Sequence, residues 1–408
     1  MTGPEQQIPD RTAGHRRNAS EVFHAFLKLG LTSFGGPIAH LGYFRKEFVE
    51  QRQWVNDAQF AQLLAICQLL PGPASSQLGF CLGLKKAGWT GALAAFVAFT
   101  LPSALLLFLF ALIAPQLFGP IGQALVHGLK LVALVVVAHG VLGMSGKLCT
   151  DARRRAIAVF VAVLMVIIGG VWLQVSVIVL GALLGFFLIR DGKDFPESAV
   201  SLNYGRKTGW ALLTCFLVLL VCLPLFAFGS NSCLEFFSAF YRAGALVFGG
   251  GHVVLPFLEQ ALVDPGWLSR DDFMAGYGAA QAVPGPMFSL SAYLGVHLPA
   301  GCGGLPGAGL ALAAIFLPGF LLVSAVLPLW HTLATHPAAS RSIAGINASV
   351  VGILAAALYD PVWVSAVDTT FDIIIALVGF ICLSVWRLSP LIVVLWCVLA
   401  SIVAASLL

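Results

Sequence analysis

Side chains that donate hydrogen bonds recur at matching positions in the two halves of this 408-residue chain. Lys28 in the first half corresponds to Arg242 in the second half, and both lie inside apolar segments. A cation inside a membrane segment costs at least about 2.5–3.5 kcal/mol of insertion free energy. A basic residue at the equivalent position of both halves therefore suggests that it has a function. The alternative interpretation is that each cation snorkels from a segment end to the head groups. The accompanying amides and hydroxyls are Gln68, Gln281, Ser75, Ser76 and Ser289.

This donor-rich set favours an anionic substrate, since metal cations prefer carboxylate and carbonyl oxygens. No buried acid is expected in the first half, and Asp360 is expected at a helix terminus. His127 and His139 are expected to be packed, hydrogen-bonded side chains and not proton carriers. The sequence holds no Walker A loop, GxSxG elbow or HExxH motif. We therefore expect a protein that is not an enzyme, with no catalytic residue, no bound metal and no cofactor.

Each half carries two helix-breaking motifs, at spacings that differ by one residue. Phe34-Gly35-Gly36-Pro37 precedes Pro71-Gly72-Pro73, and Phe248-Gly249-Gly250 precedes Pro284-Gly285-Pro286. The offset between the copies changes only from 214 to 213 residues, which identifies an internal repeat. Proline removes a backbone donor and glycine permits tight geometry, so both motifs interrupt a helix. In a membrane such a break survives only where protein or a water-filled cavity covers it.

The helix that starts after each break offers free N–H groups and a positive dipole end to an anion. We therefore predict a substrate site at the broken helices. The motif residues assigned to it, beside the side chains above, are Gly35, Gly36, Pro71, Gly72, Pro73, Gly249, Gly250, Pro284, Gly285 and Pro286. The alternative interpretation is that the glycines and prolines only kink helices or let them pack closely. Two different motifs repeated in both halves favour the substrate site.

The elements that must position these residues are membrane helices. The chain is 59% hydrophobic and 10% charged, against about 25% charged residues in soluble domains. We predict an all-α polytopic membrane protein of thirteen hydrophobic segments, arranged six, one and six. The expected segments are 21–42, 57–84, 89–114, 120–147, 154–172, 174–189, 209–229, 234–258, 272–297, 306–330, 340–363, 370–387 and 389–407.

The expected organisation is a polar cytosolic tail over residues 1–20, a first repeat over 21–189, and a second repeat over 233–408. Residues 190–232 join them as a polar linker with an extra transmembrane span. The net charge of +4 does not suggest a nucleic-acid partner. The nine cysteines lie mostly in apolar runs and include no CxxC pair, so we expect small buried hydrophobes and not disulfides or metal ligands.

Loop charges predict the orientation of the chain, because Lys and Arg accumulate in cytoplasmic loops. With the N-terminus inside, the basic loops fall inside and the loops near 115–119, 173, 230–235, 298–305 and 364–369 fall outside. If 21–42 and 57–84 are re-entrant hairpins, the basic stretch between them also lies inside. The corresponding acidic stretch of the second half then lies outside. Two crossing segments remain the alternative. Both models give halves of inverted topology, a typical design of secondary transporters.

The motifs resemble those of the chromate ion transporter (CHR) family. Phe26-Leu-Lys-Leu29-Gly30 continues into the first Phe-Gly-Gly-Pro motif, and the Pro-Gly-Pro motifs and Gly83 add to the likeness. One departure is Gly251, which stands where the first copy has Pro37. The resemblance to long-chain members covers nearly all of the chain after residue 20. It implies a multi-pass protein of the bacterial inner membrane, driven by membrane energy, that exports the dianion chromate and confers chromate resistance.

Our expectation is therefore a chromate exporter that works by alternating access between inverted halves. A sulfate or other tetrahedral oxyanion permease is the alternative, and a lipid-headgroup enzyme, a flippase or a channel is the more distant one. A dianion leaving an inside-negative cell gains on the order of 4–5 kcal/mol at 100 mV, so uniport is compatible with export and antiport stays open. The expected partners are the oxyanion and the lipid bilayer, and a homodimer is compatible with the sequence.

Overall fold

The computed structural model describes residues 11–34, 36–116, 119–189, 204–227, 233–248, 253–299, 301–330 and 337–407. The described residues form helices and contain no strand, so the all-α prediction is confirmed. The helices of the first half and the linker are α1 (Arg11–Thr32), α2 (Gly36–Arg45), η1 (Lys46–Gln51), α3 (Asp57–Leu69), α4 (Ala74–Ile113), η2 (Ala114–Gln116), α5 (Pro120–Leu148), α6 (Ala152–Ile167), α7 (Val171–Leu188) and α8 (Arg206–Ala227). Those of the second half are α9 (Cys233–Leu246), α10 (Val254–Leu262), α11 (Arg270–Ala280), η4 (Met287–Ser289), α12 (Leu290–Val296), α13 (Gly304–Val326), η5 (Leu327–Leu329), α15 (Pro337–Ala357), η6 (Leu358–Trp363), α16 (Val364–Ala366), α17 (Thr370–Ser384) and α18 (Pro390–Leu407).

Five stretches are long and apolar enough to cross a membrane: 74–116, 120–148, 206–227, 304–329 and 340–366. The other apolar helices are shorter. Polar side chains mark several helix starts. Asn56 forms a capping box with Gln59 at α3, and Asp151 accepts from the first N–H groups of α6. Ser269 caps α11 in the same way.

The Pro-Gly-Pro motifs interrupt the helices at the positions predicted from the sequence. α3 ends at Leu69 before α4 begins, and α11 ends at Ala280 before η4 begins. Gly72 and Gly285 have φ values of 117° and 98°, which side chains with a Cβ rarely adopt. The expected loop between 84 and 89 is instead a kink inside α4, since only Ala87 and Gly88 leave helical geometry there.

The first half begins with two antiparallel hairpins. Trp54 Nε1 donates to Glu21 at 3.3 Å, so the chain returns along α1 after its turn at the Phe-Gly-Gly motif. Lys85, near the end of the first part of α4, donates to Gln59 at the start of α3. Contacts between such distant ends exclude a continuous helix through Pro71–Pro73, because an unbroken helix would hold them roughly 39 Å apart.

The second half repeats both hairpins. Phe236 near the start of α9 packs edge-on against Trp267, with ring centres 4.5 Å apart, as Glu21 meets Trp54 in the first half. Gly276 of α11 lies against the ring of Tyr293 on α12, so this pair also folds back on itself. The geometry of all four hairpins agrees with the re-entrant interpretation of the motifs.

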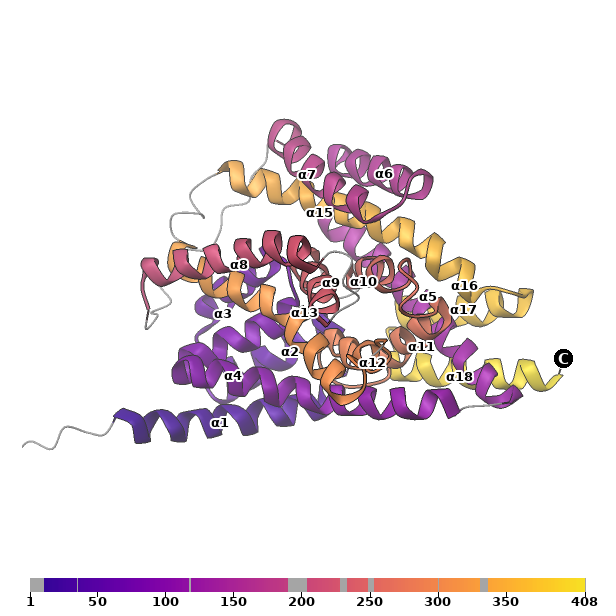
Figure 1. The fold of residues 1–408 in the computed structure, drawn as a ribbon, viewed down its shortest axis with the longest axis horizontal. Coiled ribbons are helices and arrows are strands. Elements are labelled where there is room, and N and C mark those ends of the chain that lie inside the picture. Colours follow the sequence, from indigo (N-terminus) through magenta and orange to yellow (C-terminus); the bar gives the residue numbers. More distant parts are fainter. Residues whose placement is uncertain are drawn as a thin grey trace, which may run out of the picture.

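The remaining helices interlock the two halves. α5 of the first half packs along α17 and α18 of the second, and α15 of the second half packs along α6 and α7 of the first. Figure 1 shows α6 and α7 beside α15 at the top, and α18 beside α5 at the lower right. α8 packs on α9 and α13, so the extra helix stays with the second half.

The hairpins open toward two opposite faces. At one end lies a cluster that we call the basic face, where Lys86 pairs with Glu21 at 3.3 Å and Arg52 also reaches Glu21. From there α4 runs from Trp89 to Ile113, a length of roughly 37 Å. At its far end lies the acidic face, marked by Asp271 and Asp360, which pair with Lys130 and Arg270.

Candidate substrate site at the crossed hairpin tips

The tips of the four hairpins meet crosswise between the halves. The N–H of Gly72 donates to the carbonyl of Val247 at 2.6 Å, directly before the second Phe-Gly-Gly motif. The N–H of Gly285 donates to the carbonyl of Ser33 at 3.0 Å, directly before the first one. Each Pro-Gly-Pro turn therefore binds the other half. We call the region around these four residues the hairpin joint.

The first-half side of the joint carries a buried histidine. His40 Nε2 lies 3.2 Å from the carbonyl of Ser33, and because a carbonyl only accepts, this nitrogen carries the proton. Nδ1 then accepts from the hydroxyl of Ser75 at 3.4 Å. The ring of Phe99 packs edge-on against His40, with centres 5.3 Å apart. The Ser75 hydroxyl is thus held at the start of α4.

A buried amide and a pair of serines complete the joint. Gln77 Nε2 donates to the carbonyls of Pro71 at 2.8 Å and Gly319 at 3.0 Å, which fastens the first Pro-Gly-Pro turn to α13. On the other side Ser289 donates to the carbonyl of Pro286, and its hydroxyl lies 2.6 Å from that of Ser103 on α4. Each turn is therefore tied to the long helix of the opposite half.

Several buried polar atoms at the joint and on the helices that carry it have no hydrogen-bond partner. The hydroxyl of Ser76 at the start of α4 is one, and that of Ser33 beside the Gly285 contact is another. Arg242 Nε on α9 is a buried donor of the same kind. Buried donors without partners are rare and call for a ligand, water or another explanation. Together with the first N–H groups of α4, the hydroxyls of Ser33 and Ser76 can donate to an oxyanion.

The structure divides the predicted site residues into three groups. Those buried at the joint are Pro71, Gly72, Pro73, Ser75, Ser76, Pro284, Gly285, Pro286 and Ser289, and Gly36 begins α2 beside it. Gln281 and Arg242 are half-buried, whereas Gln68 and Lys28 are exposed. Lys28 pairs with Glu47 at 3.3 Å, so it is not part of the hydrogen bonding at the joint. Gly35, Gly249 and Gly250 lie outside the described residues.

Three sequence-based expectations are wrong. Glu47 is a buried acid in the first half, 6% exposed and paired with Arg52 at 2.8 Å. Burial opposes its ionisation, yet hydrogen bonds from Arg52 and Lys28 keep the pKa of Glu47 below its usual value. Cys233 and Cys302 form a disulfide, whereas the cysteines were expected to be unpaired because the sequence contains no CxxC pair. The loop expected at residues 85–88 is the kink in α4 described above.

Other buried polar residues at the joint were not predicted from the sequence. His40, Gln77 and Ser103 are single polar residues inside apolar runs, and only their neighbours in space give them a role. The equal offset of the motifs could have pointed to His40 and Gln77, since both flank a motif within six residues. Neither has an identical counterpart in the second half, which weakened that signal.

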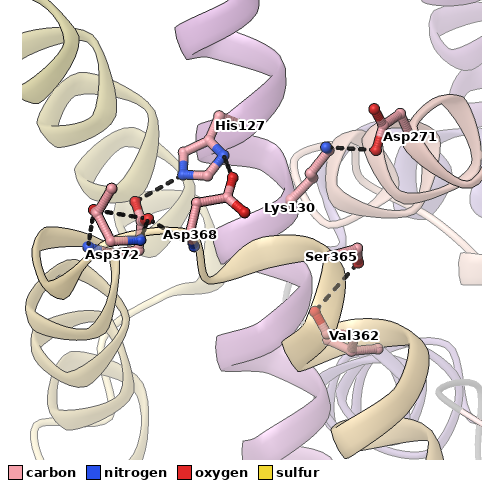
Figure 2. A network of polar contacts seen from close by, with 8 residues as sticks. His127, Lys130, Asp271, Val362, Ser365, Asp368 and Asp372 are labelled. Atoms are coloured by element: carbon pink, nitrogen blue, oxygen red, sulfur yellow. Dashed lines mark hydrogen bonds and ion pairs between the residues drawn. The ribbon is translucent and has the colours of Figure 1, made fainter.

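A second polar network lies on the acidic face (Figure 2). His127 of α5 contacts Asp372 in the first turn of α17 at 2.7 Å and Asp368, just before that helix, at 3.8 Å. One turn further along α5, Lys130 points the other way and pairs with Asp271 of α11 at 2.6 Å. His139 is hydrogen-bonded to Ser384, as expected for a packed histidine. Within the described residues no His, Cys, Asp and Glu cluster could hold a metal ion.

Comparison with known proteins places the chain in a family. A family model described as chromate transporter matches residues 20–186 and 234–402. The chain is 30% identical over 389 residues to the probable chromate transport protein of Synechococcus elongatus, covering 91% of this chain and 92% of that protein. It is 28% identical to the chromate transport protein of Cupriavidus metallidurans, covering 98% of both chains. It is 26% identical to that of Pseudomonas aeruginosa, with 85% and 82% covered.

No solved structure matches the chain significantly. The two regions matched by the family model contain the two pairs of hairpins that form the joint. The relatives are named as transporters and not as enzymes, and the long ones match this chain along most of their length. The chain, a helical protein with several apolar helices of membrane-spanning length, therefore belongs to the chromate transporter family.

Proposed function

We propose that this chain exports chromate from the cytoplasm and thereby confers chromate resistance. Relatives named as chromate transport proteins, which match most of the chain, support the substrate. Membership in a family of transporters also argues against the lipid enzyme and the flippase considered from the sequence. A permease for sulfate or another tetrahedral oxyanion is the remaining candidate, because sulfate has the same shape and charge as chromate.

The observation that carries the proposal is the crosswise pair of bonds Gly72–Val247 and Gly285–Ser33. It brings all four broken-helix tips to one place, midway between the two faces. A dianion there would meet the start of α4, the hydroxyls of Ser75 and Ser76 and the second-half turn with Ser289. Inverted repeats with a site where broken helices meet are the usual arrangement of secondary transporters.

Alternating access follows if the joint opens to one face at a time. The hairpins of the first half open toward the basic face, and those of the second half open toward the acidic face. Separation of one crosswise contact while the other holds would expose the site from a single side. No ATP is needed for export, because a dianion leaving an inside-negative cell gains on the order of 4–5 kcal/mol at 100 mV.

The proposed location is the bacterial inner membrane, with the N-terminus and the basic face in the cytoplasm. Two observations support this orientation. Basic residues gather at the first-half ends and acidic ones at the second-half ends, in line with the positive-inside rule. The disulfide Cys233–Cys302 joins two segments expected on the outer side, where the environment is oxidising. A homodimer is part of the proposal and is checked by the mass of the purified protein.

The test is uptake of chromate by inverted membrane vesicles with and without expression of the chain. We expect uptake that follows an imposed potential, positive in the lumen, without a proton gradient. Sulfate in tenfold excess should compete weakly if chromate is the substrate and strongly if the chain is a general oxyanion permease. Absence of chromate uptake by vesicles that contain the folded protein would refute the proposal.

The two cations give a sharper version of this test. Arg242→Gln should lower chromate uptake at least about tenfold, because a charge-assisted hydrogen bond contributes about 1.5–3 kcal/mol. Lys28→Gln should lower it less, since Lys28 is exposed and paired with Glu47. Uptake at the level of the unmodified chain in both variants would remove the cations from the proposed site.

A further inference from the structure

A cavity of about 200 Å³ lies at the acidic face between the hairpins of the second half and the helices of the scaffold. Its walls come from α10 and α11 on one side and from α15, η6 and the α6–α7 turn on the other. Exposed residues such as Tyr359 and Asp360 line its rim, so water reaches it from that face. A polar space of this size can hold several waters.

Glu259 of α10 is the buried acid in the wall of this cavity, with only 5% of its surface exposed. The guanidinium of Arg270 lies 3.2 Å from Glu259 and 3.2 Å from Asp360, so one cation serves two carboxylates. Asp264 is a third carboxylate in the wall. Burial raises the pKa of Glu259 to about 7, Arg270 opposes the rise, and Asp264 and Asp360 add to it.

Two further groups in the wall complete the surroundings of Glu259. Gln174 of α7 is fully buried, and its side-chain carbonyl has no hydrogen-bond partner. The side-chain carbonyl of Gln260 is also buried without one. Because the cavity presents three carboxylates and two free carbonyls to one guanidinium, it attracts a positive charge. The arrangement suits a proton carried by cavity water.

The other buried acid of the hairpins does not offer such a site. Glu47 lies between Arg52 and Lys28, at 2.8 and 3.3 Å, and both cations keep it ionised. The position equivalent to Glu259 in the first half is Arg45, whose partners Asp57 and Glu50 are exposed. A neutralisable carboxyl next to a cavity is thus found on one side of the repeat.

We propose that Glu259 is a proton-binding site filled from the acidic face, and that its protonation releases α10 from Arg270. The proposal rests on the proposed export function of this chain. In the described state, Glu259 ties α10 to Arg270 of α11, and Arg270 is itself tied to Asp360 beyond α15. A proton on Glu259 removes the first of these ties and leaves the second intact.

The consequence concerns the hairpin joint. α10 packs on α9, and Val247, which directly follows α9, is the residue that accepts from Gly72. Freed from Arg270, α10 can move away from α11 and α15 together with α9, which loosens the contact between Val247 and Gly72 at the joint. Protons outside the cell would then open the path to the acidic face and speed the release of the anion.

The experiment measures chromate uptake by inverted vesicles whose lumen, corresponding to the acidic face, is loaded at pH 6, 7 or 8. The outer pH and the membrane potential are held fixed. With a pKa of about 7 for Glu259, the protonated fraction falls roughly from nine-tenths at pH 6 to one-tenth at pH 8. We expect uptake to fall roughly tenfold across this range. Glu259→Gln should keep the rate of pH 6 throughout, because the amide imitates the protonated acid.

The matched control is Glu50→Gln, which removes a carboxylate that is half-exposed on the basic face. It should retain the pH dependence of the unmodified chain. A second measurement follows the carboxylic-acid carbonyl band in infrared spectra of the purified protein. A band that titrates near pH 7 and is lost in Glu259→Gln is expected, and this readout needs no chromate.

The outcomes separate the two proposals. A titrating band in a protein that transports no chromate would refute the proposed function and leave the proton site standing. Chromate uptake with the same pH dependence in Glu259→Gln as in the unmodified chain would overturn the proton site. The absence of a titrating band in the unmodified, folded protein would overturn it as well. Dependence of uptake on lumenal Na⁺ in place of pH would assign the cavity to another cation.

Discussion

The first-half and second-half hairpins share one design and differ in how their open ends are fastened. On the basic face, Lys86 and Glu21 form a partly exposed ion pair. At the corresponding place on the acidic face, Cys233 and Cys302 form a disulfide. Arg45 and Asp57 form an exposed pair, while their counterparts Glu259 and Arg270 have the opposite signs and one buried member.

The comparison shows that the two halves are alike at the hairpin tips, where the Pro-Gly-Pro turns lie, and differ in the interactions that hold the open ends of the hairpins. Exposed ion pairs contribute little to stability, with measured values of about 0.2–1 kcal/mol. A disulfide typically contributes about 2–4 kcal/mol. The acidic face is therefore the more firmly closed end of the structure. Unequal closures mean that the two openings cost different free energies, which changes the populations of the two open states, while the driving force sets the direction of net transport.

The largest effect is expected where the halves are alike. Gly72→Val and Gly285→Val each place a β-branched residue at a positive φ and disturb a bond across the joint. A residue with a Cβ pays about 1–2 kcal/mol for this conformation, and valine more. We expect chromate uptake to fall at least about tenfold in both variants. Normal uptake in one of them would show that the joint is not symmetric in function.

The next effect contrasts the two fastenings directly. The disulfide Cys233–Cys302 closes a loop with a sequence separation of 69, so Cys233→Ser should lower the free energy of unfolding by about 2–4 kcal/mol. Lys86→Met should lower it by no more than about 1 kcal/mol. Chemical denaturation in detergent with and without a reductant measures both. Equal losses in the two variants would remove the contrast between the faces.

A smaller effect is expected for the pairs of reversed sign. Arg270→Gln leaves the buried carboxyl of Glu259 without its hydrogen-bonding cation and should cost about 1–3 kcal/mol at pH 8. Asp57→Asn breaks a pair whose members are both more than half exposed, and the change should be close to undetectable. Melting temperatures of the two variants and the unmodified protein, measured side by side, decide the matter. A larger decrease in melting temperature for Asp57→Asn than for Arg270→Gln would contradict the expectation that the pair with a buried member stabilises the fold more.

A further effect is a dependence of stability on pH. The folded state raises the pKa of Glu259 from 4.5 to about 7, so it binds this proton more tightly than the unfolded chain does. The stabilisation is complete below pH 4.5 and is lost as the pH rises through 7. Glu259→Gln does not titrate. As the pH rises from 5 to 8, the melting temperature of Glu259→Gln should therefore increase relative to that of the unmodified chain. A difference in melting temperature that does not change with pH would contradict the raised pKa.

Much of the geometry of the candidate site could be predicted because its signals are local. Proline and glycine interrupt a helix wherever they stand, so the turns at Gly72 and Gly285 follow from the residues themselves. The same holds for the all-α class, which follows from apolar runs of sufficient length. Cations were harder to place. Lys28 and Arg242 occupy equivalent positions, yet only the fold provides Glu47 as a partner for one and leaves the Nε of the other without a partner.

The sequence by itself determined the helical class, the internal repeat and the positions of the breaks, since each depends on neighbouring residues or on spacing. Only the tertiary structure decided that each Pro-Gly-Pro turn binds the opposite half. A turn bound to its own half would have the same local geometry, so neighbouring residues cannot distinguish the two pairings. It also decided which cysteines pair and which acids are buried, as with Cys233 and Glu259. These properties depend on segments far apart in the chain, and their contacts arise from packing in three dimensions.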